Sequence, residues 1–232
     1  MRIPGPLLPA RFLDRPNRFL TIVDLDGERV EAHLPDPGRL RELLLPGAQV
    51  WVRSATGDKR KTQFTLAVVK AASGELVSVV TTLPNLLVHE ALEAKRIAEL
   101  SDWDVVSPEH TWGRSRFDFL LGTGVDRRLL LEVKSVTLVE GDRALFPDAV
   151  TARGARHVRE LAAALDAGYE AAVLFVVQRK DANSVTAARN IDSKFAEALA
   201  YAATAGVRLL AYRCEVSLDE ARITERIPVN VG

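Results

Sequence analysis

Three side chains that could act on a phosphate ester lie in two short apolar segments of the chain. Asp118 is flanked by Phe and Leu residues, and Glu132 and Lys134 end a second run rich in Leu and Val. The residues between the segments, 122–126 (Gly-Thr-Gly-Val-Asp), are typical of a turn, so the segments are expected to pair as an antiparallel hairpin. If the turn centres on Val125, Asp118 and Glu132 face each other across the hairpin.

A facing pair of carboxylates needs something to offset its repulsion. Directly opposed residues lie about 5 Å apart, where like charges are destabilising, and burial between apolar strands raises that cost. A divalent cation would offset it, because Mg²⁺ favours one or two carboxylates together with waters and a substrate phosphate. We therefore expect Asp118, Glu132 and the Val133 carbonyl to hold Mg²⁺ or Mn²⁺, with Lys134 orienting or deprotonating the attacking water. Strand alternation predicts that the apolar neighbours point to the opposite face: Phe117, Phe119 and Val133.

Ordinary ion pairs are the alternative for the same residues. In that arrangement Asp118 pairs with Arg116, and Glu132 pairs with Lys134, on a solvated strand face. A Glu-x-Lys triplet is common by chance and does not by itself indicate a site. The facing aspartate, the apolar flanks and the hairpin favour the metal site, on an assumed register.

The sequence follows different patterns on the two sides of position 83. Residues 1–83 read as five short strands with turns between them, including a strong hairpin signal at Asp26-Gly27, which fits a small oligonucleotide-binding (OB) barrel. From Pro84 onward strands and helices alternate, which predicts an α/β sheet with at least one parallel crossover. The expected helices are 84–98, 149–167 and 191–205, with one or two helical turns at 39–45. The expected strands include 48–53, 63–70, 75–80, 116–121, 128–139, 171–177 and 207–216.

Longer stretches of the chain resemble a known family. The spacing from Asp118 to Glu132-Val-Lys134 is similar to the PD-(D/E)xK nuclease signature. The stretches that resemble the sugar fermentation stimulation protein (SfsA) family are residues 9–13, 33–40, 115–121, 131–139, 144–157 and 174–179. The resemblance implies an OB-like barrel (1–83) before a restriction-endonuclease-like α/β/α domain (84–232), with DNA binding and regulation of sugar (maltose) metabolism. Position 36 is often Asn in that family; Asp36 here would weaken a phosphate contact of its loop.

Further candidates lie on the helices of the second part. Nuclease relatives often carry a Glu on the first helix that touches the metal or its water, and Glu90 is the matching residue, with a solvated helix face as the alternative. Arg153 and His157 are four residues apart and share a helix face, so both could point at the scissile phosphate. His157 could equally be a packing residue. Ordinary structural roles are expected for four other residues. Asn85 and Asp148 are expected to cap helices, Gln178 to end a strand or enter the cleft, and Cys214 to be a packing thiol.

A basic surface is expected on the barrel. Arg11, Arg15 and Arg18 are interleaved with Phe12 and Phe19, as in surfaces that bind phosphates and stack bases. Further nucleic-acid contacts are expected from one loop, with His33 and Arg39, and from a basic tip, with Lys59, Arg60 and Lys61. Either group could instead be ordinary solvated surface, and only their combination on an OB-like fold favours phosphate contact.

Composition limits the class of protein. The 232 residues carry 31 Lys+Arg and 31 Asp+Glu, a zero net charge that argues against a histone-like polyanion binder, although residues 1–83 carry a net +3. The single cysteine excludes an internal disulfide and a multi-cysteine zinc cluster. No apolar run approaches the ~18 residues of a membrane helix. A cytoplasmic protein with ordinary globular composition is expected, with no membrane or protein partner.

Three functions remain open on the sequence. The first is a Mg²⁺- or Mn²⁺-dependent nuclease, in which the barrel presents DNA, or RNA, to Asp118, Glu132 and Lys134. The second is a DNA-binding regulator that keeps the nuclease scaffold without useful turnover. The third is a metal-dependent hydrolase of a smaller phosphate compound, for which the barrel would be superfluous. Buried facing carboxylates favour the first, and the zero net charge mildly favours the other two.

Overall fold

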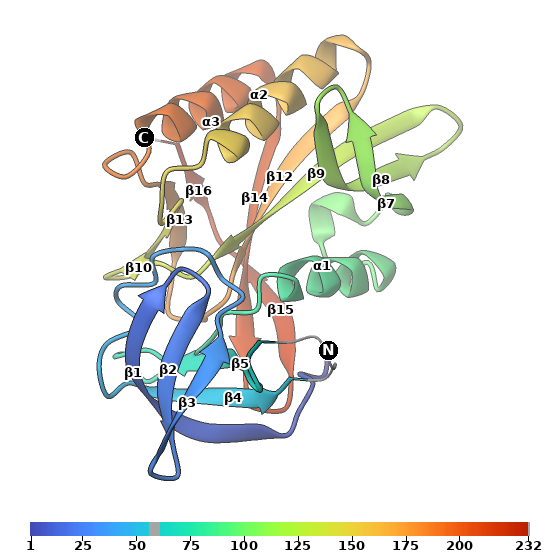
Figure 1. The fold of residues 1–232 in the computed structure, drawn as a ribbon. Helices are drawn as coiled ribbons and strands as arrows, with labels where there is room; N and C mark the ends of the chain where they lie inside the picture. The colour runs from blue at the N-terminus through green and yellow to red at the C-terminus, as the bar shows by residue number, and fades with distance from the viewer. Residues whose placement is uncertain (56–60, 232) are drawn as a thin grey trace.

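The computed structural model describes residues 1–55 and 61–231, which form a barrel followed by an α/β domain (Figure 1). None of the helices in these two ranges is long and apolar enough to cross a membrane. The two parts correspond to the change in sequence pattern near position 83. The OB barrel and the α/β fold expected from the sequence are both confirmed.

The barrel is a strongly bent sheet that closes on itself. Its strands are β1 (Leu7–Asn17), β2 (Leu20–Leu25), β3 (Glu28–His33), β4 (Gln49–Ser54), β5 (Phe64–Lys70) and β6 (Leu76–Ser78). They lie in the order β3-β2-β1-β4-β5-β6, and a parallel pairing of β3 with β5 closes the barrel. Asp26 and Gly27 form the β2–β3 turn with φ of 53° and 88°, the left-handed pair that a two-residue hairpin requires.

The segment between β3 and β4 covers one end of the barrel. It forms a single hydrogen-bonded turn, in which the amides of Leu43 and Leu44 donate to the Leu40 carbonyl, within the one or two helical turns expected at 39–45. All three leucines are buried in the barrel core. Leu40 has a φ of 49°, which is not helical, so the turn begins only after it.

The α/β domain is built on a six-stranded sheet. Its strands are β7 (Asp104–Trp112), β8 (Ser115–Thr123), β9 (Arg127–Val136), β12 (Glu170–Val177), β14 (Arg208–Val216) and β15 (Ala221–Arg226), in the order β15-β14-β12-β9-β8-β7. The three central strands β9, β12 and β14 run parallel, which confirms the predicted crossovers. Helices α2 (Ala152–Asp166) and α3 (Ser193–Ala205) lie together on one face, and α1 (Leu83–Glu93) lies on the other (Figure 1).

Side-chain caps set helix boundaries that differ from those expected. Thr151 accepts from the amide of Gly154 and Asp192 accepts from that of Phe195, so α2 and α3 begin later than predicted. Asp148 is therefore no cap. Asn85 is not the N-cap of α1 either, because the helix already begins at Leu83.

Several elements were missed by the sequence analysis because they are short or lie at the edge of a sheet. Beyond β7 and β15, these are a 3-10 turn at Ala98–Leu100, where α1 was expected to continue, and a second small sheet. That sheet contains β10 (Val139–Glu140), β11 (Arg143–Phe146), β13 (Ser184–Ala187) and β16 (Val229–Asn230). β10 is separate because β9 ends at Val136, before the expected position 139.

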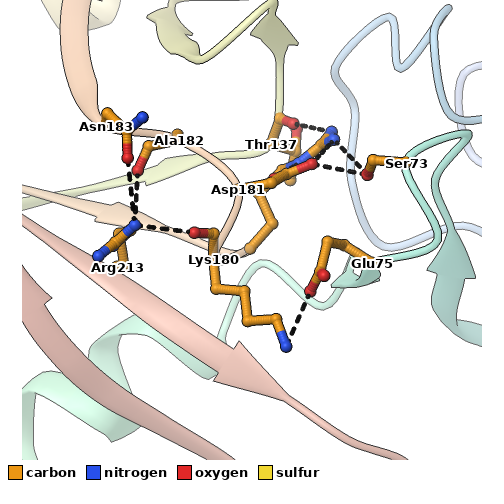
Figure 2. A network of polar contacts seen from close by, with 9 residues as sticks. Ser73, Glu75, Thr137, Lys180, Asp181, Ala182, Asn183 and Arg213 are labelled. Atoms are coloured by element: carbon orange, nitrogen blue, oxygen red, sulfur yellow. Dashed lines mark hydrogen bonds and ion pairs between the residues drawn. The ribbon is translucent and has the colours of Figure 1, made fainter.

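A buried arginine joins the barrel to the α/β domain. Arg179, which follows β12, donates from Nε and Nη2 to the two carboxylate oxygens of Asp181, at 2.6 and 2.7 Å. Ser73 of the barrel donates its hydroxyl to Asp181 at 2.6 Å, and Lys180 lies 3.7 Å from Glu75 (Figure 2). Arg179 Nη1 also reaches the carbonyl of Thr137, at 3.4 Å. This network ties a barrel loop to the ends of β9 and β12.

The first residues of the chain cross to the second domain. The Met1 amino group donates to the Ala221 carbonyl at 2.8 Å, and the Ile3 amide donates to the Asp219 carbonyl at 2.8 Å. Met1 and Ile3 pack against the core cluster on the α1 face of the large sheet. The two domains are thus joined by the N-terminal segment as well as by the Arg179 network.

Candidate active site

The β8–β9 hairpin has the register expected from its turn. Pairs run from Thr123 with Arg127 to Phe119 with Leu131, and the residue numbers of each pair sum to 250. This confirms the assumed register. The ladder ends one pair before Asp118 and Glu132, because β9 continues beside β12 while β8 continues beside β7.

Asp118 occupies the gap where the two strands separate. Its Oδ2 accepts from the amide of Val133 at 2.7 Å, and its Oδ1 accepts from Nδ2 of Asn85, on α1, at 2.6 Å. The separation also breaks the expected alternation of faces. Phe117 packs in the core under α2 and α3, whereas Phe119 and Val133 pack on the α1 side, so the three do not share one face.

Glu132 has one saturated and one free carboxylate oxygen. Oε1 accepts from Lys134 Nζ at 2.5 Å and lies 2.7 Å from Nδ1 of His157. Oε2 is buried and has no hydrogen-bond partner among the described residues, and the residue as a whole is 4% exposed. The pairing of Glu132 with Lys134 matches the ion-pair alternative, whereas Arg116 lies beside Glu109, at 3.5 Å, instead of beside Asp118.

His157 and Arg153 extend the network from α2, and their predicted shared face is confirmed by direct contact. Arg153 Nε donates to His157 Nε2 at 3.2 Å, which leaves Nδ1 to carry the proton that is donated to Glu132. The histidine is 2% exposed and touches the carboxylate directly. It therefore positions Glu132 and does not itself reach the open cleft.

Burial and hydrogen bonding move the pKa values of the two carboxyl groups in opposite directions. Burial, and then the charge of Glu132, raise the pKa of Asp118 against the hydrogen bonds from Val133 and Asn85. Burial also acts to raise the pKa of Glu132, but His157 and Lys134 together outweigh it and the pKa is lowered. Glu132 is therefore the carboxylate that stays ionised most readily.

The oxygen atoms at this position fit a hard divalent cation. No group of three or more His, Cys, Asp and Glu side chains in the described ranges is arranged as a ready-made metal site. Mg²⁺ needs only one or two carboxylates plus water and phosphate oxygens. The unpartnered Oε2 of Glu132, and Asp118, whose pKa the charge of Glu132 helps to raise, meet that need. The C=O of a strand residue points to the same edge as its N–H, so the Val133 carbonyl faces the Asp118 side, beyond the end of the β8–β9 ladder.

Lys134 lines a cavity between the two domains. The cavity has a volume of about 300 Å³ and is lined by the end of β9, the segment before α2 and the barrel loop at Asp36–Gly38. Asp36 is partly buried there and accepts from the Gly38 amide at 2.8 Å. Asp148 lies against the same loop, with its carboxylate 3.4 Å from the Leu40 amide. The loop thus forms one wall of the site.

The barrel residues predicted to bind nucleic acid have different surroundings. Arg11, Arg18 and Arg39 are exposed, while Arg15 donates to the carbonyls of Arg39 and Arg18, at 2.7 and 2.8 Å, and holds the loop in place. Phe12 is buried in the barrel core and cannot stack a base, which corrects the expectation for it. His33 is partly buried and Lys61 exposed, and both line a hollow beside Phe19. Lys59 and Arg60 lie outside the described residues.

Two predicted residues lie away from the carboxylate pair. Glu90 forms ion pairs with Arg96 and with the Met1 amino group, and none of its described contacts is with Asp118 or Glu132. Gln178 is fully buried, and its amide has no hydrogen-bond partner in the described structure.

The sequence analysis missed Asn85 as a partner of Asp118. The signal was Pro84, which marks the first turn of a helix and so places Asn85 inside α1.

The comparisons with known proteins agree over both parts of the chain. Residues 13–79 match the SfsA N-terminal OB domain, and residues 82–220 match the sugar fermentation stimulation protein RE domain. A sugar fermentation stimulation protein homolog of Shouchella clausii is 48% identical, with 100% of both chains covered, and one of Geobacter metallireducens is 45% identical, with 99% of both covered. A solved structure of Pyrococcus furiosus SfsA in complex with Ca²⁺ has a TM-score of 0.89 at 28% identity, covering 99% of this chain and 98% of that one. The chain therefore belongs to the sugar fermentation stimulation protein (SfsA) family.

Proposed function

We propose that the protein is a Mg²⁺- or Mn²⁺-dependent nuclease that hydrolyses phosphodiester bonds of DNA or RNA. The observation that carries the proposal is the pair Asp118 and Glu132, held at the point where β8 and β9 separate, with one buried oxygen of Glu132 left without a partner. A buried anionic oxygen without a partner is costly. A cation is the simplest group that removes that cost.

The cation would be held by Asp118, Glu132 and the Val133 carbonyl, and would stabilise the charge that develops on a phosphate. All three donors are hard oxygen atoms, as Mg²⁺ and Ca²⁺ prefer. The Pyrococcus furiosus relative, which has the same fold, was solved in complex with Ca²⁺. The Ca²⁺ complex supports a divalent-cation site in this family. The oxygen donors of Asp118, Glu132 and Val133 support its location at this position of the chain.

Lys134 is the residue that would handle the attacking water. Its ammonium is held 2.5 Å from Glu132, and the residue lines the cavity that opens between the domains. A cation fixed in that place can hold a water, or the phosphate oxygen beside it, in a single orientation. His157 and Arg153 keep Glu132 in its rotamer and are positioning residues.

The barrel would supply affinity for the nucleic-acid backbone. Arg11, Arg18 and Arg39 are exposed on it, and the last two line the hollow that leads toward Lys134. Contacts of this kind bind phosphates irrespective of sequence and weaken steeply with salt. The cytoplasmic location expected from the sequence stays a prediction.

A DNA-binding regulator of sugar (maltose) metabolism without turnover is the second candidate. The observation that favours it is the pairing of Glu132 with Lys134 and His157, which already satisfies one carboxylate oxygen without any cation. In that case the same residues would stabilise the fold, and the basic barrel surface would be the functional part.

The test is incubation of the purified protein with end-labelled single- and double-stranded DNA and RNA. The reactions contain Mg²⁺, Mn²⁺ or a chelator. We expect cleavage with Mg²⁺ or Mn²⁺ and none with the chelator, because the carboxylate site alone cannot stabilise the phosphate charge. Binding without cleavage under every metal condition would leave the regulator as the function. Absence of both would exclude the two candidates together.

A further inference from the structure

Three hollows on the surface run in series from the barrel to the carboxylate site. The first, of about 490 Å³, contains Phe19, His33 and Lys61. The second, of about 470 Å³, has four arginines among its nine lining residues and shares Asn17 with the first. The third is the cavity at Lys134. The second and third share five lining residues: Arg18, Pro37, Gly38, Ala149 and Val150. The second and third hollows therefore adjoin closely, and the first meets the second at Asn17; we call this series the path.

The backbone of Phe19 is fixed by hydrogen bonds at the far end of this path, while its ring is exposed. Its amide donates to the Asn17 side chain at 2.9 Å. Its carbonyl accepts from the Leu34 amide at 2.9 Å and lies 3.2 Å from His33 Nδ1. The side chain is 51% exposed, and within residues 1–55 and 61–231 Phe19 and Tyr201 are the only exposed Phe, Tyr or Trp residues. Because the backbone is already ordered, an exposed ring at this place can stack on a flat partner without the cost of ordering the loop.

The middle of the path carries positive charge. Arg18, Arg39 and Arg41 are exposed there and lie between Phe19 and Lys134 along the series of hollows. Exposed guanidinium groups in a groove bind the phosphates of a nucleic-acid backbone and do not distinguish its bases. Val150, which is 69% exposed, stands where the arginine hollow meets the Lys134 cavity and offers an apolar contact to a base or sugar.

We infer that the protein takes a single strand of nucleic acid along this path, with an unpaired base stacked on Phe19. This rests on the proposed function, since it names the strandedness of the substrate of the same site. The face of a base is free for stacking only when the base is unpaired or at an end, because in a duplex it is covered by its neighbours. Lys61 and His33 beside the ring supply polar groups for the edge of that base.

The inference is tested by binding, without any need for turnover. Labelled single strands and the matching duplexes, of equal length and sequence, are titrated in chelator against wild type, Phe19→Ala, Phe19→Trp and Tyr201→Ala. Tyr201 is the matched control, because it is the other exposed aromatic of the two (63%) and lies on α3, away from the path. We expect Phe19→Ala to weaken single-strand binding about tenfold or more, Phe19→Trp to restore it, and Tyr201→Ala to leave it unchanged. Thermal melts confirm that the variants are folded.

A series of strand lengths shows whether Phe19 and Lys134 act on one strand. Affinity should rise with length until the strand spans the path, and Phe19→Ala should remove the last part of that rise. Equal affinity for single strand and duplex, or equal behaviour of Phe19→Ala and Tyr201→Ala, would overturn the inference. Cleavage can then still occur, so this failure is distinct from that of the nuclease. Tight Phe19-dependent binding without cleavage would instead reject the nuclease and keep the path.

Discussion

The barrel and the α/β domain display their candidate residues in opposite ways. In the α/β domain the polar groups are buried and fixed by short contacts, with Glu132 4% and His157 2% exposed. In the barrel the candidate groups lie on the surface, with Phe19 51% exposed and Arg18 and Arg39 in open hollows. Buried groups can be held to a few tenths of an ångström, as a reaction requires, whereas exposed groups can adapt to a flexible chain. The difference indicates chemistry in one region and binding in the other.

Asp118→Asn should have the largest effect, and it falls on the α/β domain alone. Asn85 and Val133 donate to different oxygens of the carboxylate, so in the amide an NH2 group, which cannot accept, faces one of these two donors, and the charge that a cation needs is lost. We expect cleavage to fall about 100-fold or more, and Mn²⁺ affinity, measured by calorimetry with an uncleavable oligonucleotide, to fall with it. Asp126→Asn, in the exposed β8–β9 turn, is the control. Equal rates in the two variants would refute a role for Asp118.

Arg179→Met should weaken the connection between the two regions. The arginine is buried and its partner Asp181 is partly exposed, at 6% and 21%, so the loss should cost roughly 2–3 kcal/mol of unfolding free energy. For a chain of this size that corresponds to a melting temperature lower by roughly 5–10 °C. Lys180→Met, which removes only the more exposed pair with Glu75, should cost under about 1 kcal/mol. Equal melting temperatures for the two variants would show that the domains do not depend on the buried pair.

Asp36→Asn should change the pH dependence of stability at the barrel loop that lines the cavity between the domains. Burial raises the pKa of Asp36 to about 6, helped by Asp148 and opposed by the hydrogen bond from Gly38. The unfolded chain releases this proton near pH 4, so the folded state loses stability as pH rises from about 4 to about 6. The amide keeps the acceptor for Gly38 without the buried charge. We expect it to raise stability by about 2 kcal/mol at pH 7 and to change nothing at pH 3.5. Urea unfolding at both pH values is the measurement, and a gain of equal size at both would contradict this account.

His157→Ala should have a smaller effect on turnover. Residues that orient a metal ligand typically contribute 10- to 100-fold, and Lys134 still holds Glu132 when the imidazole is gone. We expect a cleavage rate about tenfold lower, with partial recovery in His157→Asn, whose amide can donate from nearly the position of Nδ1. Measurement of kcat and KM separately shows where the loss lies. A change in KM alone would place His157 in substrate binding.

The sequence predicted best what depends on neighbouring residues. The register of the β8–β9 hairpin followed from its turn, and Asp26-Gly27 formed the expected left-handed turn. The contact of Arg153 with His157 followed from helical spacing. The sequence could not predict contacts made by the packing of distant segments: Asn85 on Asp118, Asp148 at the Leu40 amide, and Arg179 beside Ser73. Strand alternation failed around Asp118, where the pairing of β8 with β9 has already ended while that of β8 with β7 goes on.

Lys134→Gln tests most directly the claim that the buried region performs the chemistry. Cleavage in Mg²⁺ under single-turnover conditions, oligonucleotide binding and thermal melting are measured on one preparation. His157 still supports Glu132 in the variant, so the fold should keep its melting temperature within a few degrees. We predict a loss of cleavage of about 100-fold or more, with unchanged affinity for DNA, because the binding arginines lie on the barrel. An unchanged cleavage rate, or a loss that only follows a collapse of the melting temperature, would contradict the account.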